Sequence, residues 1–340
     1  MKGESPMESD VTKSFVQIVN IIEKTRENTF KKVNEELIMM YWNIGKFLSE
    51  EARNASFGDA YMDSVAAFIQ DKFPGIKGFT RRGLYRMKRF YDIYREDEFV
   101  TTLLTQISWS NHLAIISKAK TEEERHFYLM LCMRENYTAR ELQRQIDSAY
   151  YERYMLSKDK ISPEIVKGNT NTPFLDTYVL DFLSLPQNYK ERDLKRAILS
   201  NLKDFILEVG KDFTFVDEEY KVEVGNRDFF IDLLFYHRGL CCLVAFELKI
   251  GQFEPEYISK MDFYLEALDR QSRKKNENPS VGVILCASKD DEVVEYALSR
   301  SLSPTMVSDY TLQLPDKKIL RRKLRELSEI AEIEEIEVQE

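Results

Sequence analysis

Three residues on two neighbouring apolar segments have the types and spacing of a catalytic site. Asp232 lies inside "DFFIDLLFY" (228–236), and Glu247 and Lys249 lie near the end of "LCCLVAFELKIG" (240–251). A carboxylate within an apolar strand is costly unless it is paired or binds a cation. Because side chains alternate along a strand, Glu247 and Lys249 are expected to share one face. A short hairpin between the two strands would place Asp232 beside Glu247.

This arrangement favours a metal-dependent phosphodiesterase site. Carboxylate oxygens are hard ligands suited to Mg²⁺ or Mn²⁺. Such an ion polarises a phosphodiester and lowers the pKa of a bound water, and Lys249 beside it would orient that water or stabilise the transition state. We therefore predict Asp232, Glu247 and Lys249 as catalytic residues, with Asp232 and Glu247 as metal ligands. The structural alternative is a Glu247–Lys249 salt bridge at a sheet edge, with Asp232 capping the hairpin.

The elements around these residues follow from hydrophobic periodicity. Glu191–Val209 has the pattern of one amphipathic helix ending at Gly210. Further along the chain we expect strands at 213–224, 228–236 and 241–249, a helix near Pro255–Leu268, a strand at 281–286, a helix near Asp291–Arg300 and a strand around Thr305–Ser308. This order, α-β-β-β-α-β-α-β, predicts a small mixed sheet flanked by helices.

The two halves of the chain differ in their patterns. Residues 10–155 show helical periodicity almost throughout, which predicts an all-α N-terminal domain. Residues 156–174 collect Pro, Gly, Asn and Thr, as expected for a linker. An α/β domain is predicted over 175–315, and a C-terminal helix with an acidic tail over 316–340.

One segment of the first half is strongly basic. Residues 76–95 hold seven Lys and Arg against one acid, Asp92, whereas the whole chain has a net charge of −9. Thr80 is placed to cap a helix whose apolar side includes Leu84, Met87 and Phe90. The pattern suits the recognition helix of a helix-turn-helix DNA-binding domain, because Arg pairs with phosphate and guanine. The predicted DNA contacts are Arg81, Arg82, Arg86 and Arg89. The alternative is a solvated helix whose arginines pair with nearby acids.

Composition sets the broad class. No apolar stretch approaches the roughly 20 residues that span a bilayer, and the start of the chain has no secretory pattern. Four cysteines without paired spacing predict a cytoplasmic protein and argue against a zinc site. His112 is expected to cap or pack, and His237 to face solvent in a hairpin turn. We expect DNA as the partner and neither a membrane nor a small organic cofactor; a homo-oligomer is left open.

Longer stretches of the sequence resemble a known protein family. "YWNIGKFLSE", "FPGIKGFTRRGLYRMKRFYDIY", "ENYTARELQRQI" and "FIDLLFYHRGLCCLVAFELKIGQFEPEYISKMDFYL" are similar to the bacterial YhcG-like nucleases. That family pairs an N-terminal helical domain of unknown function with a C-terminal PD-(D/E)XK (restriction-endonuclease-like) domain. The resemblance runs from about Phe15 to about Asp309. It implies a metal-dependent DNA nuclease with Asp232 and Glu247 as ligands and Lys249 as the catalytic lysine.

The chain departs from the family at two positions. Family members commonly carry a Glu where this chain has Lys195; Glu191, one turn earlier, or Glu208 is then the candidate for the first-helix acid. Many relatives carry a Gln where this chain has Lys260, and a lysine cannot accept a hydrogen bond. These changes leave open a second reading, a weakened nuclease-like module that binds DNA or assembles with protein.

Overall fold

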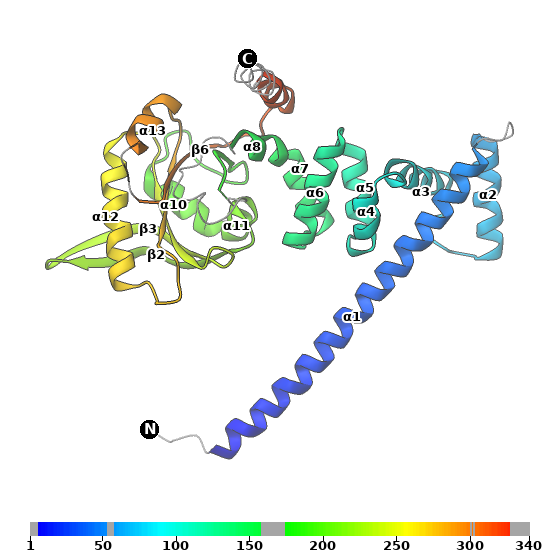
Figure 1. The fold of residues 1–340 in the computed structure, drawn as a ribbon, viewed down its shortest axis with the longest axis horizontal. Coiled ribbons are helices and arrows are strands. Elements are labelled where there is room, and N and C mark those ends of the chain that lie inside the picture. Colours follow the sequence, from blue (N-terminus) through cyan, green and yellow to red (C-terminus); the bar gives the residue numbers. More distant parts are fainter. Residues whose placement is uncertain (1–5, 53–57, 158–173, 300, 302, 327–340) are drawn as a thin grey trace, which may run out of the picture. The chain divides into compact units, whose positions relative to one another are not determined.

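The structure is a computed structural model that describes residues 6–52, 58–157, 174–299, 301 and 303–326. The chain forms two compact units, Met1–Leu142 and Gln143–Glu340 (Figure 1). Much of the predicted linker, 158–173, and most of the predicted tail, 327–340, lie outside the described residues. Among the residues that are described, no helix is both long and apolar enough to cross a membrane.

The first unit is helical, as its periodicity predicts. Its described elements are α1 (Pro6–Glu51), α2 (Asp59–Lys72), α3 (Arg81–Tyr94), α4 (Glu98–Leu103), the 3₁₀ turn η1 (Leu104–Gln106), α5 (Trp109–Lys118) and α6 (Glu122–Glu135), with α7 (Ala139–Asp147) crossing into the second unit. Thr80, Ser108 and Thr121 each accept a hydrogen bond from the first turn of the helix that follows. Local capping therefore sets where these helices begin.

Close packing of α1 on α3 holds the basic helix in place. Tyr41 and Leu48 of α1 are buried together with Leu84 and Met87 of α3. A Cβ added at Gly45 would lie 2.2 Å from the carbonyl oxygen of Met87. Only glycine permits this approach of the two backbones. One side of α3 is thus fixed in the core, and its other side remains exposed.

The second unit is built on a six-stranded mixed sheet with the order β1-β6-β5-β4-β3-β2. Its strands are β1 (Thr177–Val179), β2 (Phe213–Val224), β3 (Arg227–His237), β4 (Cys242–Leu248), β5 (Val281–Cys286) and β6 (Thr305–Thr311). Strands β2, β3 and β4 pair antiparallel, whereas β4, β5, β6 and β1 pair in parallel. The predicted mixed sheet is confirmed.

Helices cover both faces of this sheet (Figure 1). On one face, α12 (Glu256–Gln271) packs Met261 and Leu265 into a core that includes Ala245 and Ile284. On the other, Phe205 of α11 (Leu202–Val209) lies 5.8 Å from Phe246, ring centre to ring centre. The remaining helices are α8 (Tyr150–Ser157), α10 (Glu191–Ser200), α13 (Asp291–Leu298) and a helical segment at 317–326.

The hairpin between β2 and β3 turns where "GNRD" predicts it. Gly225 and Asn226 have φ of 58° and 62°, and Val224 pairs with Arg227. Two residues with positive φ match the right-handed twist of the flanking strands. The register of β3, and with it the face on which Asp232 lies, begins at this turn.

Three expectations were wrong. The expected helix 191–209 is two helices, α10 and α11, because the chain breaks at Asn201 (φ −119°, ψ 33°). Strand β1 was not expected; it is short and exists only by parallel pairing with β6. His237 is buried, because it packs on Phe213 at 4.7 Å and its Nδ1 accepts a hydrogen bond from Leu240 N.

A buried ion network ties α7 and α8 to the sheet. The Glu208 carboxylate lies 2.7 Å from Arg144 and 2.6 Å from Arg153 and accepts a hydrogen bond from Val179 N in β1. Burial alone would raise the pKa of Glu208, but the two arginines outweigh it and lower that pKa. Glu208 thus has a structural role, and it lies on the helix next to α10 rather than among the carboxylates of the candidate site.

Candidate functional site

The sheet register places Asp232 and Glu247 at neighbouring positions on adjacent strands. Leu233 pairs with Phe246 at the last described rung between β3 and β4, so Asp232 and Glu247 are the next residues on each strand. Because side chains alternate, Glu247 projects to the face opposite that of Phe246, the face on which Ala245 lies. This is the face that α12 covers. The two carboxylates therefore come from adjacent central strands of the sheet.

Lys249 completes the group. Its Nζ lies 2.9 Å from Glu247 Oε1, and its side chain is 12% exposed. Its backbone N donates to Leu285 O, which continues the β4–β5 ladder past the end of β4. The salt bridge of the structural alternative is therefore present, but β4 lies between β3 and β5 and not at a sheet edge.

Asp232 bonds to the backbone as well as to a side chain. Its Oδ2 accepts a hydrogen bond of 3.0 Å from Leu248 N, and its Oδ1 lies 3.6 Å from Lys195 Nζ. Lys195 comes from α10 and also pairs with Glu219 of β2 at 2.6 Å. The aspartate is thus oriented by β4 itself, while one of its oxygens faces a lysine.

Glu247 is the most buried member of the site. It is 2% exposed, and its Oε1 contacts both Lys249 and Lys260 of α12. Its Oε2 is buried and has no hydrogen-bond partner among the described residues. A buried carboxylate oxygen without a partner is costly. Its burial beside Asp232 gives the pair the chemistry of an oxygen-rich cation site.

The three lysines of the site are held in the charged form. Burial lowers the pKa of Lys249 and of Lys260, but bonding to Glu247 outweighs it, so both pKa values lie above normal. The pKa of Lys195 is likewise raised, because Glu219 and Asp232 outweigh the effect of burial. The carboxylates therefore face fixed positive charges on both flanking helices.

Glu191 is the first-helix acid that reaches the site. Its Oε1 lies 3.5 Å from Lys249 Nζ, and it stands in the first turn of α10, one turn before Lys195. Its side chain is 49% exposed, so it lies on the solvent side of Lys249.

A cavity of about 560 Å³ adjoins Lys195. It is lined by Arg192, Lys195, Arg196, Leu199, Ser200, Glu218 and Glu219. Arg192 and Arg196 are exposed, one turn apart on α10, and neither has an ion pair or hydrogen bond within the described part of the chain. Sequence reasoning missed these residues and Glu219, because the fold of β2 against α10 is what brings them together.

The basic helix α3 presents its predicted arginines in two different states. Arg81 pairs with Asp63 at 3.0 Å and with Asp59 at 3.6 Å, and Arg89 donates to Ile116 O. Arg82 and Arg86 are exposed and have no partner among residues 6–52, 58–157 and the other described ranges. Residues 73–80 join α2 to α3, which is longer than the three or four residues usual in a helix-turn-helix.

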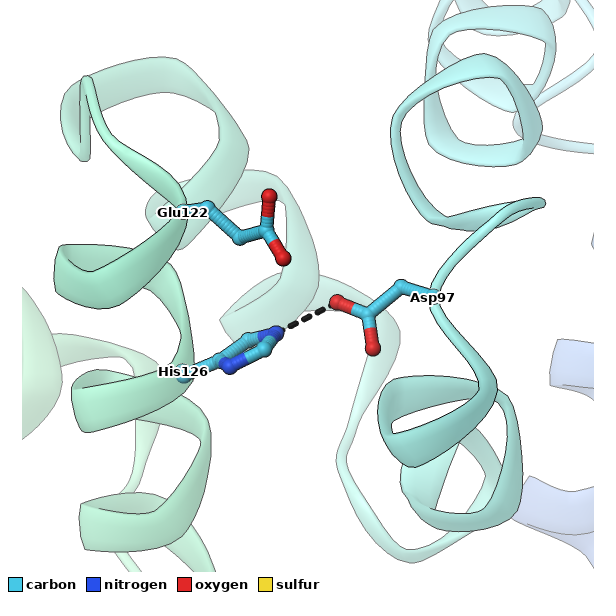
Figure 2. Close-up of side chains that lie close together, drawn as sticks. All are labelled: Asp97, Glu122 and His126. Atoms are coloured by element: carbon cyan, nitrogen blue, oxygen red, sulfur yellow. Dashed lines mark hydrogen bonds and ion pairs between the residues drawn. The ribbon is translucent and has the colours of Figure 1, made fainter.

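A second group of metal-ligand types lies in the first unit. One ligand atom from each of Asp97, Glu122 and His126 falls within 4.8 Å of the others. Figure 2 shows His126 and Asp97 pointing toward each other, with Glu122 beside them. Asp97 also caps α4 by accepting from Val100 N. The imidazole and the cap account for the position of this carboxylate, and the group is distinct from Asp232 and Glu247.

Comparison with known proteins divides the chain in the same two parts. Residues 171–325 match the family model of the YhcG PDDEXK nuclease domain, and residues 17–153 match the DUF1016 N-terminal domain. A protein of Escherichia coli (strain K12) named "Putative nuclease YhcG" is 29% identical over 347 residues, covering 90% of this chain and 92% of that protein.

Similarity to solved structures is weak. A repair endonuclease from Pyrococcus abyssi (16% identity) and an EndoMS–double-stranded-DNA complex (15%) each match with a TM-score of 0.26. Each match covers 39% of this chain and about half of the other, 50% and 48%. The family matches are the ones that extend over both units. The chain thus carries a DUF1016 N-terminal domain followed by a YhcG PDDEXK nuclease domain.

Proposed function

We propose that this protein hydrolyses phosphodiester bonds in DNA with Mg²⁺ or Mn²⁺, and that Asp232, Glu247 and Lys249 carry the reaction. Nucleases of the PDDEXK group generally use divalent metals. The observation that carries the proposal is the meeting of these three residues on adjacent central strands of a PDDEXK domain. A cytoplasmic location remains part of the proposal.

The residues present fit a divalent cation. The carboxylates of Asp232 and Glu247 would hold it, and Oε2 of Glu247 is buried without a hydrogen-bond partner among the described residues. When bound, the ion would activate water and stabilise negative charge on the phosphate oxygens. The chain supplies the rest: Leu248 N fixes the orientation of Asp232, and Lys249 is positioned to hold a phosphate oxygen or the attacking water.

Two exposed pairs of arginines support the choice of a polyanionic substrate. Arg192 and Arg196 stand on α10, whose Glu191 and Lys195 reach the site. Arg82 and Arg86 stand on α3 in the other unit. An arginine without a carboxylate partner is available for phosphate, to which it binds in a bidentate manner. We propose Arg82 and Arg86, with Arg81 and Arg89 beside them, as DNA contacts of the N-terminal domain.

The test is cleavage of supercoiled plasmid and of single-stranded DNA with Mg²⁺, Mn²⁺ or EDTA. We expect cleavage by the wild type with metal, none with EDTA, and a loss of at least about 10²-fold in Asp232→Asn and Lys249→Ala. Lys275→Ala, at an exposed lysine outside the site, serves as a preparation control. If the wild type cuts no faster than Asp232→Asn with every metal, the nuclease proposal is overturned.

A second candidate is a weakened nuclease-like module that binds DNA without cutting it. Lys195 and Lys260 favour it, because each places a positive charge beside a carboxylate that a metal needs. Electrophoretic mobility shifts in EDTA separate the two functions. DNA binding by the wild type that is accompanied by no cleavage under any metal would select the second candidate.

A further inference from the structure

We propose that Lys195 and Lys260 are exchangeable counter-ions, which hold the carboxylates of the site until a divalent cation displaces them. Glu219 receives Lys195 when it leaves Asp232. This inference rests on the metal-dependent function proposed above and adds to it a positioning role for three residues. None of the three is predicted to touch the reacting phosphate.

Lys195 contacts two carboxylates, and it lies closer to one than to the other. Its Nζ lies 2.6 Å from Glu219 Oε1 but 3.6 Å from Asp232 Oδ1. Glu219 is 63% exposed, whereas Lys195 is 14% exposed. The lysine already has its closer bond to Glu219. It can therefore give up Asp232 without becoming a buried cation that lacks a partner.

Lys260 has a comparable alternative. Its ammonium contacts Glu247 Oε1, and it also lies over the ring of Tyr264, 5.3 Å from the centre. The side chain is 46% exposed, so solvent and the aromatic face can take over the charge. Lys249 differs from it: at 12% exposure it stays beside Glu247, as a positioned lysine should.

A divalent cation held by the carboxylates of Asp232 and Glu247 would compete with these ammonium groups for the same anions. Two positive charges a few ångströms apart repel strongly even at the effective dielectric near a protein surface. The lysines therefore lower metal affinity, and they stabilise the carboxylate pair when no metal is bound. Removing a lysine should tighten metal binding, whereas removing the residue that receives it should weaken metal binding.

The experiment measures Mn²⁺ binding to the full-length protein by calorimetry, without DNA. Asp232→Asn identifies the part of the heat that belongs to this site, since Asp97, Glu122 and His126 form a separate group. Lys195→Gln and Lys260→Gln should each lower the dissociation constant of that part by about tenfold. Glu219→Gln should raise it by about threefold to tenfold, because Lys195 then has only Asp232 as its partner.

The chain offers a matched control for Glu219. Glu218 precedes it on β2, is exposed, lines the same cavity and makes no described side-chain ion pair. Glu218→Gln removes the same charge and should leave Mn²⁺ affinity within about twofold of the wild type. The double variant Lys195→Gln with Glu219→Gln should bind Mn²⁺ like Lys195→Gln alone, because the acceptor has lost its donor.

The outcomes separate this inference from the function on which it rests. If wild type and Asp232→Asn bind Mn²⁺ identically, both are overturned. If Asp232→Asn loses a binding component that Lys195→Gln, Lys260→Gln and Glu219→Gln leave unchanged, only the exchange is overturned. If Glu218→Gln and Glu219→Gln weaken Mn²⁺ binding equally, Glu219 acts only through its charge, and its role as the acceptor of Lys195 is overturned. Thermal unfolding of each variant checks that it is folded.

Discussion

The candidate site and the basic helix α3 both carry cations, but these differ in whether an acid of the protein pairs with them. In the site, Lys195, Lys249 and Lys260 each lie within 4 Å of a carboxylate. On α3, Arg82 and Arg86 are exposed and have no partner among the described residues. The first set is committed to internal anions, and the second remains available for external ones. The same residue types therefore serve structure or binding according to their neighbours.

The difference has a physical origin. Burial requires a charge to be paired, so the cations that are buried in the sheet domain are accompanied by acids. A charge on a solvated helix face is stable without a partner, and its free energy changes only when a counter-charge arrives. Substitution of a paired, buried cation should therefore change the free energy of unfolding. Substitution of an exposed, unpaired cation should change the affinity for an anionic ligand.

The largest expected effect is a loss of stability when the buried arginines of the second unit lose their carboxylate partner. Glu208→Ala leaves Arg153, which is 2% exposed, without its anion, and should cost about 3–5 kcal/mol of the free energy of unfolding of that unit. Hydrogen exchange of β5, which is fully buried, reports this loss. Both tryptophans, Trp42 and Trp109, lie in the first unit, so their fluorescence should show an unchanged midpoint there. Equal destabilisation of both units would contradict the local role of Glu208.

The next effect concerns acid sensitivity in the first unit. His112 is fully buried against Phe90 and its pKa is lowered by burial to about 4, from an ordinary 6.5. Between pH 6.5 and pH 4, His112 is therefore protonated in the unfolded chain but neutral in the folded chain. Stability is complete above pH 6.5 and is lost as the pH falls toward 4, by about 3 kcal/mol. Urea unfolding followed by tryptophan fluorescence at pH 7 and pH 4.5 measures it; His112→Gln should flatten this dependence.

Charge reversal on α3 should act on binding alone. Arg82→Glu with Arg86→Glu should weaken DNA binding by about 10²-fold and reduce the slope of log affinity against log salt by about two. The unfolding midpoint should be unchanged. Lys24→Glu with Lys31→Glu, on exposed positions of α1, is the matched control with the same change of charge. If both pairs weaken binding equally, only net charge matters and the surface on α3 has no special role.

The smallest effect is expected for an ion pair between neighbouring turns of one helix, in which both side chains keep contact with solvent. Lys88 lies 2.5 Å from Asp92, with 21% and 34% of the two side chains exposed. Lys88→Gln should cost less than about 1 kcal/mol in the free energy of unfolding of the first unit. A loss of 3 kcal/mol or more in urea titrations would show that pairing, rather than burial, distinguishes the two kinds of cation.

Periodicity predicted most of the elements that carry the site. Strands β3, β4 and β5 were predicted within one or two residues, because alternating or continuous apolar runs between turn residues have few other solutions. The turn at Gly225 and Asn226 followed from the backbone conformations that these residues tolerate. Strand β1 was not predictable in this way, since three residues carry no period and its pairing partner is more than 100 residues away.

The site divides along the same line. The sequence by itself predicted Asp232, Glu247 and Lys249 as one group, because an acid inside an apolar strand is a rare and costly feature. It also marked α3 as basic. Only the tertiary structure decided that Glu191 and not Glu208 reaches Lys249, that Lys195 bridges to Glu219, and which arginines on α3 stay unpaired. Ion pairs form between residues far apart in the chain, and their partners are selected by packing, which no local pattern encodes.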